Sequence, residues 1–266
     1  FSPVAIDDVT VGIMGGLDAF DVTMNTTGFY QGNVPMSADL AANIGLGNDI
    51  RVVADKFDFA LSDQAIKLRR PLQFVMAANG QQNLDADVTV GSGRLVATVA
   101  QEAGQKSIAG DLSLDDVDLG PWGRIAGYDG LSGVANLSAN LRETKGTLPV
   151  AAVKGRISGI TANTVKDMEP FEMVLNLDLA KGILNGTANL GNRDVKILSA
   201  QGTVPLAVSV LAQNFSPDLA APVSASVRMN GEIAEFWPYV PAPDHQVSGT
   251  INLELDVAGT LDDIGW

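Results

Sequence analysis

The stretch that decides the fold lies near the end of the chain and reads Val247-Ser248-Gly249-Thr250-Ile251-Asn252-Leu253-Glu254-Leu255-Asp256-Val257-Ala258-Gly259-Thr260-Leu261. From Thr250 to Val257, polar and apolar residues alternate strictly. Successive side chains of a β-strand point to opposite faces, so one face of this segment is apolar and the other is polar. Glycine stands near both ends, where the chain must turn. The stretch therefore predicts an amphipathic strand bounded by glycine turns.

The same alternation recurs from residue 9 onward, while helical periodicity is nearly absent. The other apolar sets are Val9–Ile13, Phe20–Met24, Met36–Leu46, Phe57–Leu61, Leu84–Val90, Leu95–Val99, Ala135–Leu141, Phe171–Leu179, Val204–Val210 and Val223–Met229. Gly91-Ser92-Gly93 joins two of them and is a hairpin signal. Two segments, Leu119–Ala126 and Ile233–Tyr239, break the alternation, and each predicts a single helical turn or a short helix. The irregular spacing favours a meander of unequal hairpins over a solenoid of fixed coil length.

The chain shows no Pro- or Ser-rich linker and no block of like charges. We therefore predict one continuous all-β domain over residues 1–266, an elongated, curled antiparallel or mixed β-sheet with one or two short helices. Strand patterning is already running by Val9 and continues to the end of the sequence, so we expect the chain to be an internal piece of a longer protein.

The charge and composition exclude several classes of partner. The 266 residues include 17 Lys and Arg against 31 Asp and Glu, a formal net charge of -14. This charge argues against nucleic-acid binding, which needs a basic surface, and against simple adsorption to an anionic membrane. There is no cysteine, so disulfides and thiolate metal sites are excluded. No apolar run approaches the ~18 residues of a membrane-spanning helix.

Candidate catalytic or metal-binding residues are few. The only histidine, His245, lies beside Asp244 in a proline-rich stretch, without a serine in a nucleophile-elbow context. An acidic cluster could in principle bind calcium, but its spacing does not match an EF-hand loop, so outward-facing strand and turn carboxylates are the better interpretation. The cluster consists of Asp111, Asp115, Asp116 and Asp118. We therefore predict that the protein is not an enzyme, and that it has no cofactor or metal.

The apolar strand faces are the remaining candidate site. They are mixtures of Val, Leu, Ile and Ala, and only 6% of the chain is aromatic. Composition alone leaves two interpretations open: the core of an ordinary sandwich or barrel, or an unfilled groove for acyl chains. If a groove exists, the predicted lining residues are Leu40, Ile44, Val88, Val90, Leu137, Leu141, Leu175, Leu177, Leu179, Val204, Leu206, Val208, Val210, Val227, Ile251, Leu253, Leu255 and Val257.

Several short motifs resemble the TamB-like translocation and assembly module family, within the wider group of AsmA-like bridge proteins. The first is Gly202-Thr203-Val204-Pro205-Leu206, and two strand starts, Leu131-Ser132-Gly133 and Val247-Ser248-Gly249, are similar to each other. Gly259-Thr260-Leu261-Asp262-Asp263, which follows the alternating Leu253, Leu255 and Val257, is similar to the repeated phrase of that family.

The resemblance implies a fold, a place and a function. The fold is a β-taco, a long curled sheet enclosing an apolar groove, in a protein anchored in the inner membrane of a diderm bacterium. Such a protein crosses the periplasm to an outer-membrane barrel of the BamA type. The implied function is transfer of phospholipids between the two membranes; the alternative is a chaperone-like scaffold for assembly of outer-membrane β-barrel proteins and autotransporters. Because an excised open sheet has edges at both ends, we also expect end-to-end self-association.

Overall fold

The structure, a computed structural model, describes residues 4–128, 130–162, 169–192, 196–212, 214–217, 220–233, 247–260 and 262–265. Its elements in chain order are β1 Val4–Gly15, β2 Ala19–Tyr30, β3 Val34–Leu46, β4 Ile50–Leu61, β5 Gln64–Leu68, β6 Leu72–Met76, β7 Gln82–Val90, β8 Gly93–Gln101, the 3-10 turn η1 Ala103–Gln105, β9 Ser107–Asp118, α1 Leu119–Ile125, β10 Leu131–Thr144, β11 Val150–Ala162, β12 Phe171–Ala180, β13 Ile183–Gly191, β14 Lys196–Ser209, β15 Asn214–Pro217, β16 Pro222–Glu232, β17 Thr250–Thr260 and β18 Asp263–Gly265.

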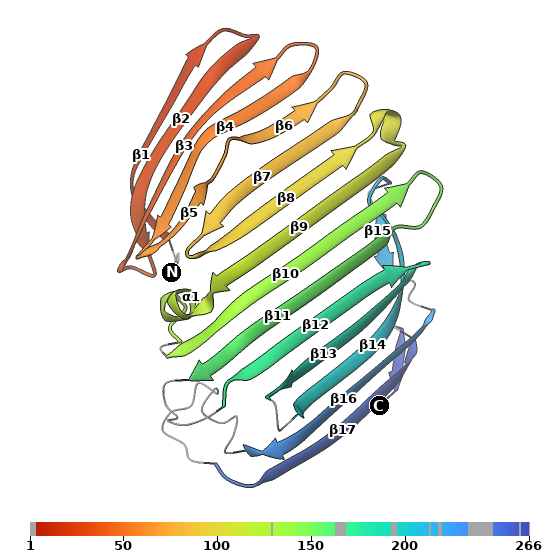
Figure 1. The fold of residues 1–266 in the computed structure, drawn as a ribbon. Helices are drawn as coiled ribbons and strands as arrows, with labels where there is room; N and C mark the ends of the chain where they lie inside the picture. Colours follow the sequence, from red (N-terminus) through yellow and green to blue (C-terminus); the bar gives the residue numbers. More distant parts are fainter. Residues whose placement is uncertain are drawn as a thin grey trace.

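The strands of the described residues form a long antiparallel meander (Figure 1). Each pairing joins strands that are neighbours or next neighbours along the chain. The short strands β5 and β6 follow one another, and each pairs with both β4 and β7. The all-β, elongated antiparallel fold predicted from the alternation is confirmed, as are the Gly91–Gly93 hairpin and the short helix after Asp118.

Strand register keeps the apolar residues of successive strands on one face. Val227 lies opposite Leu255 and Met229 opposite Leu253 across β16 and β17. Paired residues share a face, and alternation carries that face along each strand. The polar residues of β17 occupy the other face, where Arg228 donates a hydrogen bond of 2.8 Å from Nε to Glu254.

β-Bulges keep the apolar residues on this face at points where the polar–apolar alternation of the sequence shifts by one residue. In β4 the register shifts opposite Ala41 and Ala42, so that Asp55 is the extra residue. Ala54 before the bulge and Phe57 after it consequently lie on the same side. This bulge is the reason that the alternation between Ile50 and Leu68 looks irregular in the sequence. A second bulge lies in β9 at Asp116, which has a left-handed φ of 54°.

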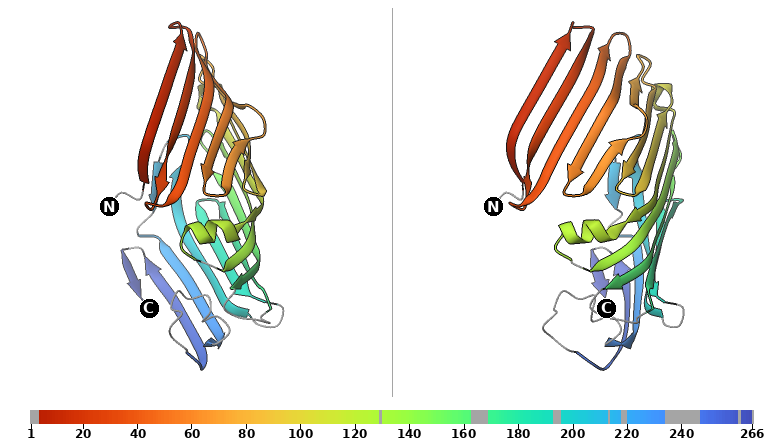
Figure 2. Two further views of the ribbon diagram at one scale, coloured as in Figure 1. Left: turned by 90° about the vertical axis from the view of Figure 1, so that its left-hand side faces the viewer. Right: turned by 60° about the vertical axis from the view of Figure 1, so that its left-hand side comes forward.

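The sheet is curved, and β15 lies on its concave side (Figure 2). Glu143, which shares a face with Leu141 of β10, accepts hydrogen bonds from the turn that leads into β15, so the apolar face is the concave one. A single curved layer exposes far more surface than a compact domain. The accessible area is 15982 Å², whereas a folded protein of this mass exposes about 11,000 Å². In the described residues the buried apolar side chains are few, and several are alanines: Ala42, Ala54, Ala86, Val117, Phe171, Leu179, Ile197 and Val223. The described residues therefore contain no second layer that turns the apolar face into a conventional core.

Some predictions fall outside the described residues. They are the second helix, of which only Ile233 is described, and the pair Asp244 and His245.

Candidate binding surface on the concave side

We define the apolar face as the inward-facing apolar positions of the main sheet from β1 to β17, which include the predicted lining residues other than Leu206, Val208 and Val210. Of the eighteen predicted residues, fifteen are half-buried, Leu179 is buried, and Leu253 and Leu255 are exposed. A closed core would bury most of them. Most of the apolar face is therefore reachable from solvent, and whether it contacts lipid stays a prediction.

The face is most exposed on the strands at the two ends of the sheet. On β1, Val9, Val11 and Ile13 are 51%, 57% and 67% exposed. On β17, Leu253 and Leu255 are 46% and 40% exposed. Most positions in the middle of the sheet are half-buried by their neighbours on adjacent strands, with Met173 on β12, at 36% exposure, as an exception. The most exposed positions of the apolar face therefore lie on β1 and β17.

At one rim, α1 lies on the concave side of the sheet (Figure 2). Asp118 caps the helix by accepting a hydrogen bond of 2.9 Å from the Gly120 backbone N–H. Gly120 and Gly123 are buried, and a Cβ on Gly123 would lie 3.3 Å from the Tyr128 carbonyl oxygen. The glycines let the helix approach the start of β10 closely. The indole Nε1 of Trp122 is buried there without a hydrogen-bond partner among the described residues.

At the opposite rim, the end of β14 leaves the main sheet. Residues 198–203 of β14 pair with β16, but residues 206–209 pair with β15 in a separate short hairpin. We call the described residues 206–212 and 214–217 the β14–β15 hairpin. Leu206 and Val208, predicted to line the groove, lie in this hairpin, and Val210 lies in the turn beyond β14 rather than in a strand. The alternation of these residues is real, but their partner strand is β15.

A buried carboxylate anchors the β14–β15 hairpin. Glu143, near the end of β10, is 5% exposed and accepts hydrogen bonds from the Ser209 hydroxyl and from the backbone N–H groups of Val210 and Leu211, the latter two at 2.7 and 3.2 Å. Glu143 lies opposite Ile108 in the register, so it occupies a position of the apolar face. Sequence analysis missed it; the signal was a charged residue continuing the set Ala135–Leu141.

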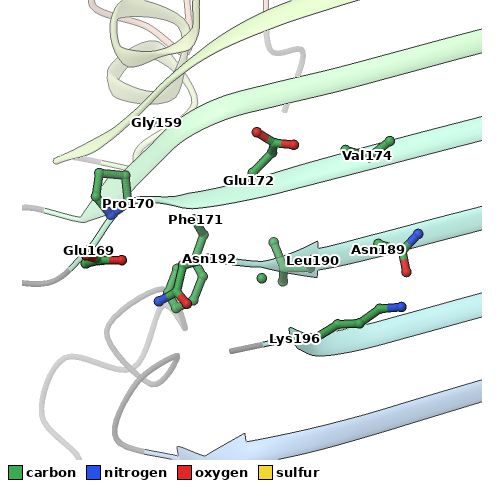
Figure 3. A pocket seen from close by; sticks show the side chains of 11 residues that line it. Gly159, Glu169, Pro170, Phe171, Glu172, Val174, Asn189, Leu190, Asn192 and Lys196 are labelled. Atoms are coloured by element: carbon green, nitrogen blue, oxygen red, sulfur yellow. The ribbon is translucent and has the colours of Figure 1, made fainter. Parts of the chain in front are cut away.

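Two depressions lie on the polar, convex face among the described residues. One, of about 780 Å³, lies at the ends of β12 and β13 and is lined by Glu172, Asn189 and Lys196 among others (Figure 3). A second, of about 540 Å³, lies over β13, β14, β16 and β17 and includes Thr187, Gln201 and other polar residues. Both linings mix polar and apolar residues; the first also includes Phe171, Val174 and Leu190.

The convex face also holds an arginine-clamped carboxylate. Asp87 is 5% exposed and accepts two hydrogen bonds from Arg94, of 2.9 and 2.8 Å, while the Nε atom of Arg70 lies 3.5 Å away. The hydrogen bonds from Arg94 hold the pKa of Asp87 below its ordinary value, outweighing the effect of burial. Arg70 also makes a bidentate pair with Asp85. The cluster joins β7 and β8 to the break between β5 and β6, so its role is structural.

The acidic residues of β9 have structural partners. Asp111 pairs with Arg142, Asp115 accepts a hydrogen bond from Ser113, and Asp118 caps α1. The described part of the chain contains no group of three metal-ligating side chains placed to hold an ion. Among the same residues, no helix has the length and apolar character needed to span a membrane.

Comparisons of the chain with protein-family models, curated proteins and solved structures find no match. The functional argument therefore rests on the surface itself.

Proposed function

We propose that this chain is a segment of a periplasmic bridge whose apolar face carries the acyl chains of phospholipids between the inner and outer membranes. The observation that carries the proposal is the apolar face: it runs from β1 to β17 on the concave side, and nearly all of its predicted lining residues are half-buried or exposed. An apolar surface of this extent is unusual on a soluble protein and marks an interaction surface.

The physical chemistry of the face suits an acyl chain. Each CH₂ group removed from water gains about 0.8 kcal/mol. Side chains of Val, Leu, Ile and Ala present no polar group that would fix a tail at one point. With about 4.8 Å between strands, a sheet of this many strands extends for several tens of ångströms, and about twenty strands would span on the order of 100 Å. A tail can therefore slide along many similar weak sites while the headgroup stays in water.

A photo-crosslinking residue on β10 tests the proposal. Leu137 lies on the apolar face, and its neighbour Ser138 is exposed on the opposite face. We expect a crosslinker at position 137 to capture phospholipid from vesicles and one at position 138 not to. In a transfer assay between vesicles, Leu255→Asp should reduce transfer without unfolding the protein, because Leu255 is 40% exposed. Equal labelling at both positions, or no adduct at either, would rule out the proposal.

The chaperone-like scaffold is the alternative, and an edge strand favours it. From Asp8 to Gly15, the pairing of β1 in the described residues is with β2 alone. An edge strand with exposed valines can accept another extended chain. If crosslinkers on β1 capture nascent outer-membrane β-barrel proteins, while Leu137 captures no lipid, the scaffold replaces the lipid bridge. The periplasmic location and a BamA-type barrel partner remain predictions from the resemblance.

A further inference from the structure

Glu143 is an exception on the apolar face. Its neighbours at that face of β10 are Leu141 and Ala139, yet its carboxylate is buried. A buried carboxylate is stable only when hydrogen bonds replace its hydration. Among the described residues, the three hydrogen bonds of Glu143 come from residues 209–211, which lie 66 to 68 residues further along the chain.

The donors belong to the tip of the β14–β15 hairpin. Two consecutive backbone N–H groups, of Val210 and Leu211, converge on one carboxylate oxygen, Oε2. Convergent backbone N–H groups form a specific cradle for an anion. The Ser209 hydroxyl donates to the other oxygen, Oε1, and accepts from the Ala212 backbone N–H. One glutamate thus organises the whole turn.

The hairpin crosses the rim between β14 and β10. Three strands, β11, β12 and β13, separate β10 from β14 in the sheet. A segment that leaves the sheet at β14 and contacts β10 must pass the ends of these strands, and Figures 1 and 2 show β15 on the concave side. Leu179, the penultimate residue of β12, is the only predicted lining residue that is buried, at 8% exposure. At the same rim, the Gly182 carbonyl accepts a hydrogen bond from the Leu206 backbone N–H.

We propose that Glu143 is a latch that holds the β14–β15 hairpin across this rim, and that releasing its hydrogen bonds lets the hairpin lift and uncovers the ends of β11, β12 and β13. The apolar face then has a section whose access is controlled by one carboxylate. That an uncovered section admits an acyl chain rests on the proposed function, whereas the latch itself does not.

Amide hydrogen exchange tests the latch without any lipid. In Glu143→Gln, the exchange of the Val210 and Leu211 amides should become about tenfold faster or more, the factor expected when charge-assisted hydrogen bonds are lost. Amides in the β10–β11 ladder should keep their protection, which shows that the sheet is folded. Glu254→Gln, on the convex face, is the matched control and should leave both amides unchanged. Ser209→Ala, which removes the hydroxyl donor and keeps the carboxylate, should give a smaller acceleration.

A distance measurement gives the movement itself. The chain has no cysteine, so Lys145→Cys and Ala212→Cys place two spin labels at exposed positions beside the latch and on the hairpin. The distribution of distances should be narrow with Glu143 and longer and broader with Glu143→Gln. Unchanged distances and unchanged amide exchange in both Glu143→Gln and Glu143→Ala would overturn the latch.

A crosslinker at Leu179 connects the latch to lipid. Glu143→Gln should increase the yield of phospholipid adduct at position 179 several-fold and leave the yield at position 137 unchanged. If neither position ever captures lipid, the proposed function fails, while exchange and distance still decide the latch. If position 137 captures lipid and the yield at position 179 does not respond to Glu143→Gln, the bridge stands and the control of access by Glu143 is wrong.

Discussion

β1 and the β10–β14 section carry the same alternation of apolar and polar residues, yet their apolar faces differ in exposure. Val11 on β1 is 57% exposed, whereas Leu179 on β12 is 8% exposed. The difference does not come from the strands themselves. The β10–β14 section has neighbours on both sides, α1 at one rim and the β14–β15 hairpin at the other, while β1 is an edge strand. Burial in a single curved sheet is thus decided by which segments fold back over it.

The largest expected effect separates these two regions directly. Leu179→Asp places a charge at a buried position near the end of β12 and should lower the free energy of unfolding by about 3–5 kcal/mol. Val11→Asp exposes its charge to water and should change it by no more than about 0.5 kcal/mol. Urea denaturation of both variants measures the difference. Equal losses of stability would mean that the apolar face is equally covered on β1 and on the β10–β14 section in solution.

An intermediate effect is expected on the convex face, where buried and exposed carboxylates should also differ in their contribution to stability. Asp87→Asn removes the clamped carboxylate in the middle of the sheet and should cost about 2 kcal/mol at neutral pH. The pKa of Asp87 is lowered by Arg94, so its contribution is present above the ordinary carboxyl pKa and is lost as pH falls through the lowered value. The gap in Tm between the wild type and Asp87→Asn should therefore close in acid.

Asp39, on β3 near the edge strand β1, is the control for that experiment. Its pKa is also lowered, first by a hydrogen bond from Asn25 and then by Lys56. It is solvated, however, and exposed ion pairs contribute little to stability. Asp39→Asn should change Tm only slightly at any pH. A large, pH-dependent loss of Tm in Asp39→Asn would show that the stability of the strands near β1 depends on the ion pairs of their polar face.

The smallest effect concerns how tightly the two regions are packed. A Cβ on Gly28, in β2, would lie 2.2 Å from the Ala5 carbonyl oxygen, whereas one on Gly155, in β11, would meet only side-chain atoms at 3.7 and 3.9 Å. Gly28→Ala should destabilise the β1–β2 pair by about 1–2 kcal/mol. Gly155→Ala should be neutral or stabilise by less than about 1 kcal/mol. Thermal unfolding of the two variants should rank them in this order; the reverse order would show that β1 is loosely paired despite its register.

The strands could be predicted because a face that is apolar along its length forces a period of two, as in Leu253, Leu255 and Val257. The bulge at Asp55 could not, because a change of parity in the sequence looks the same as the end of a strand. The departure of β14 from the sheet could not be predicted either, because Val204, Leu206 and Val208 alternate through it. The one local signal is Pro205, which cannot donate to a ladder and lies between the residues that pair with β16 and those that pair with β15. What changes there is the partner strand, and the turn that follows donates hydrogen bonds to Glu143, far away in the sequence.

The pairing of each strand with its chain neighbours has a consequence for how such a molecule varies in length. In a linear stack, each hairpin touches only the hairpins beside it, as in repeat proteins. Adding or deleting one hairpin would change the span by about 10 Å and leave the remaining registers intact. The contact between Glu143 and the β14–β15 hairpin breaks this rule, because it ties together strands that are not adjacent. Between β10 and β14 the number of strands is therefore fixed by a closed loop, and we expect changes in length to be tolerated on either side of that section and not within it.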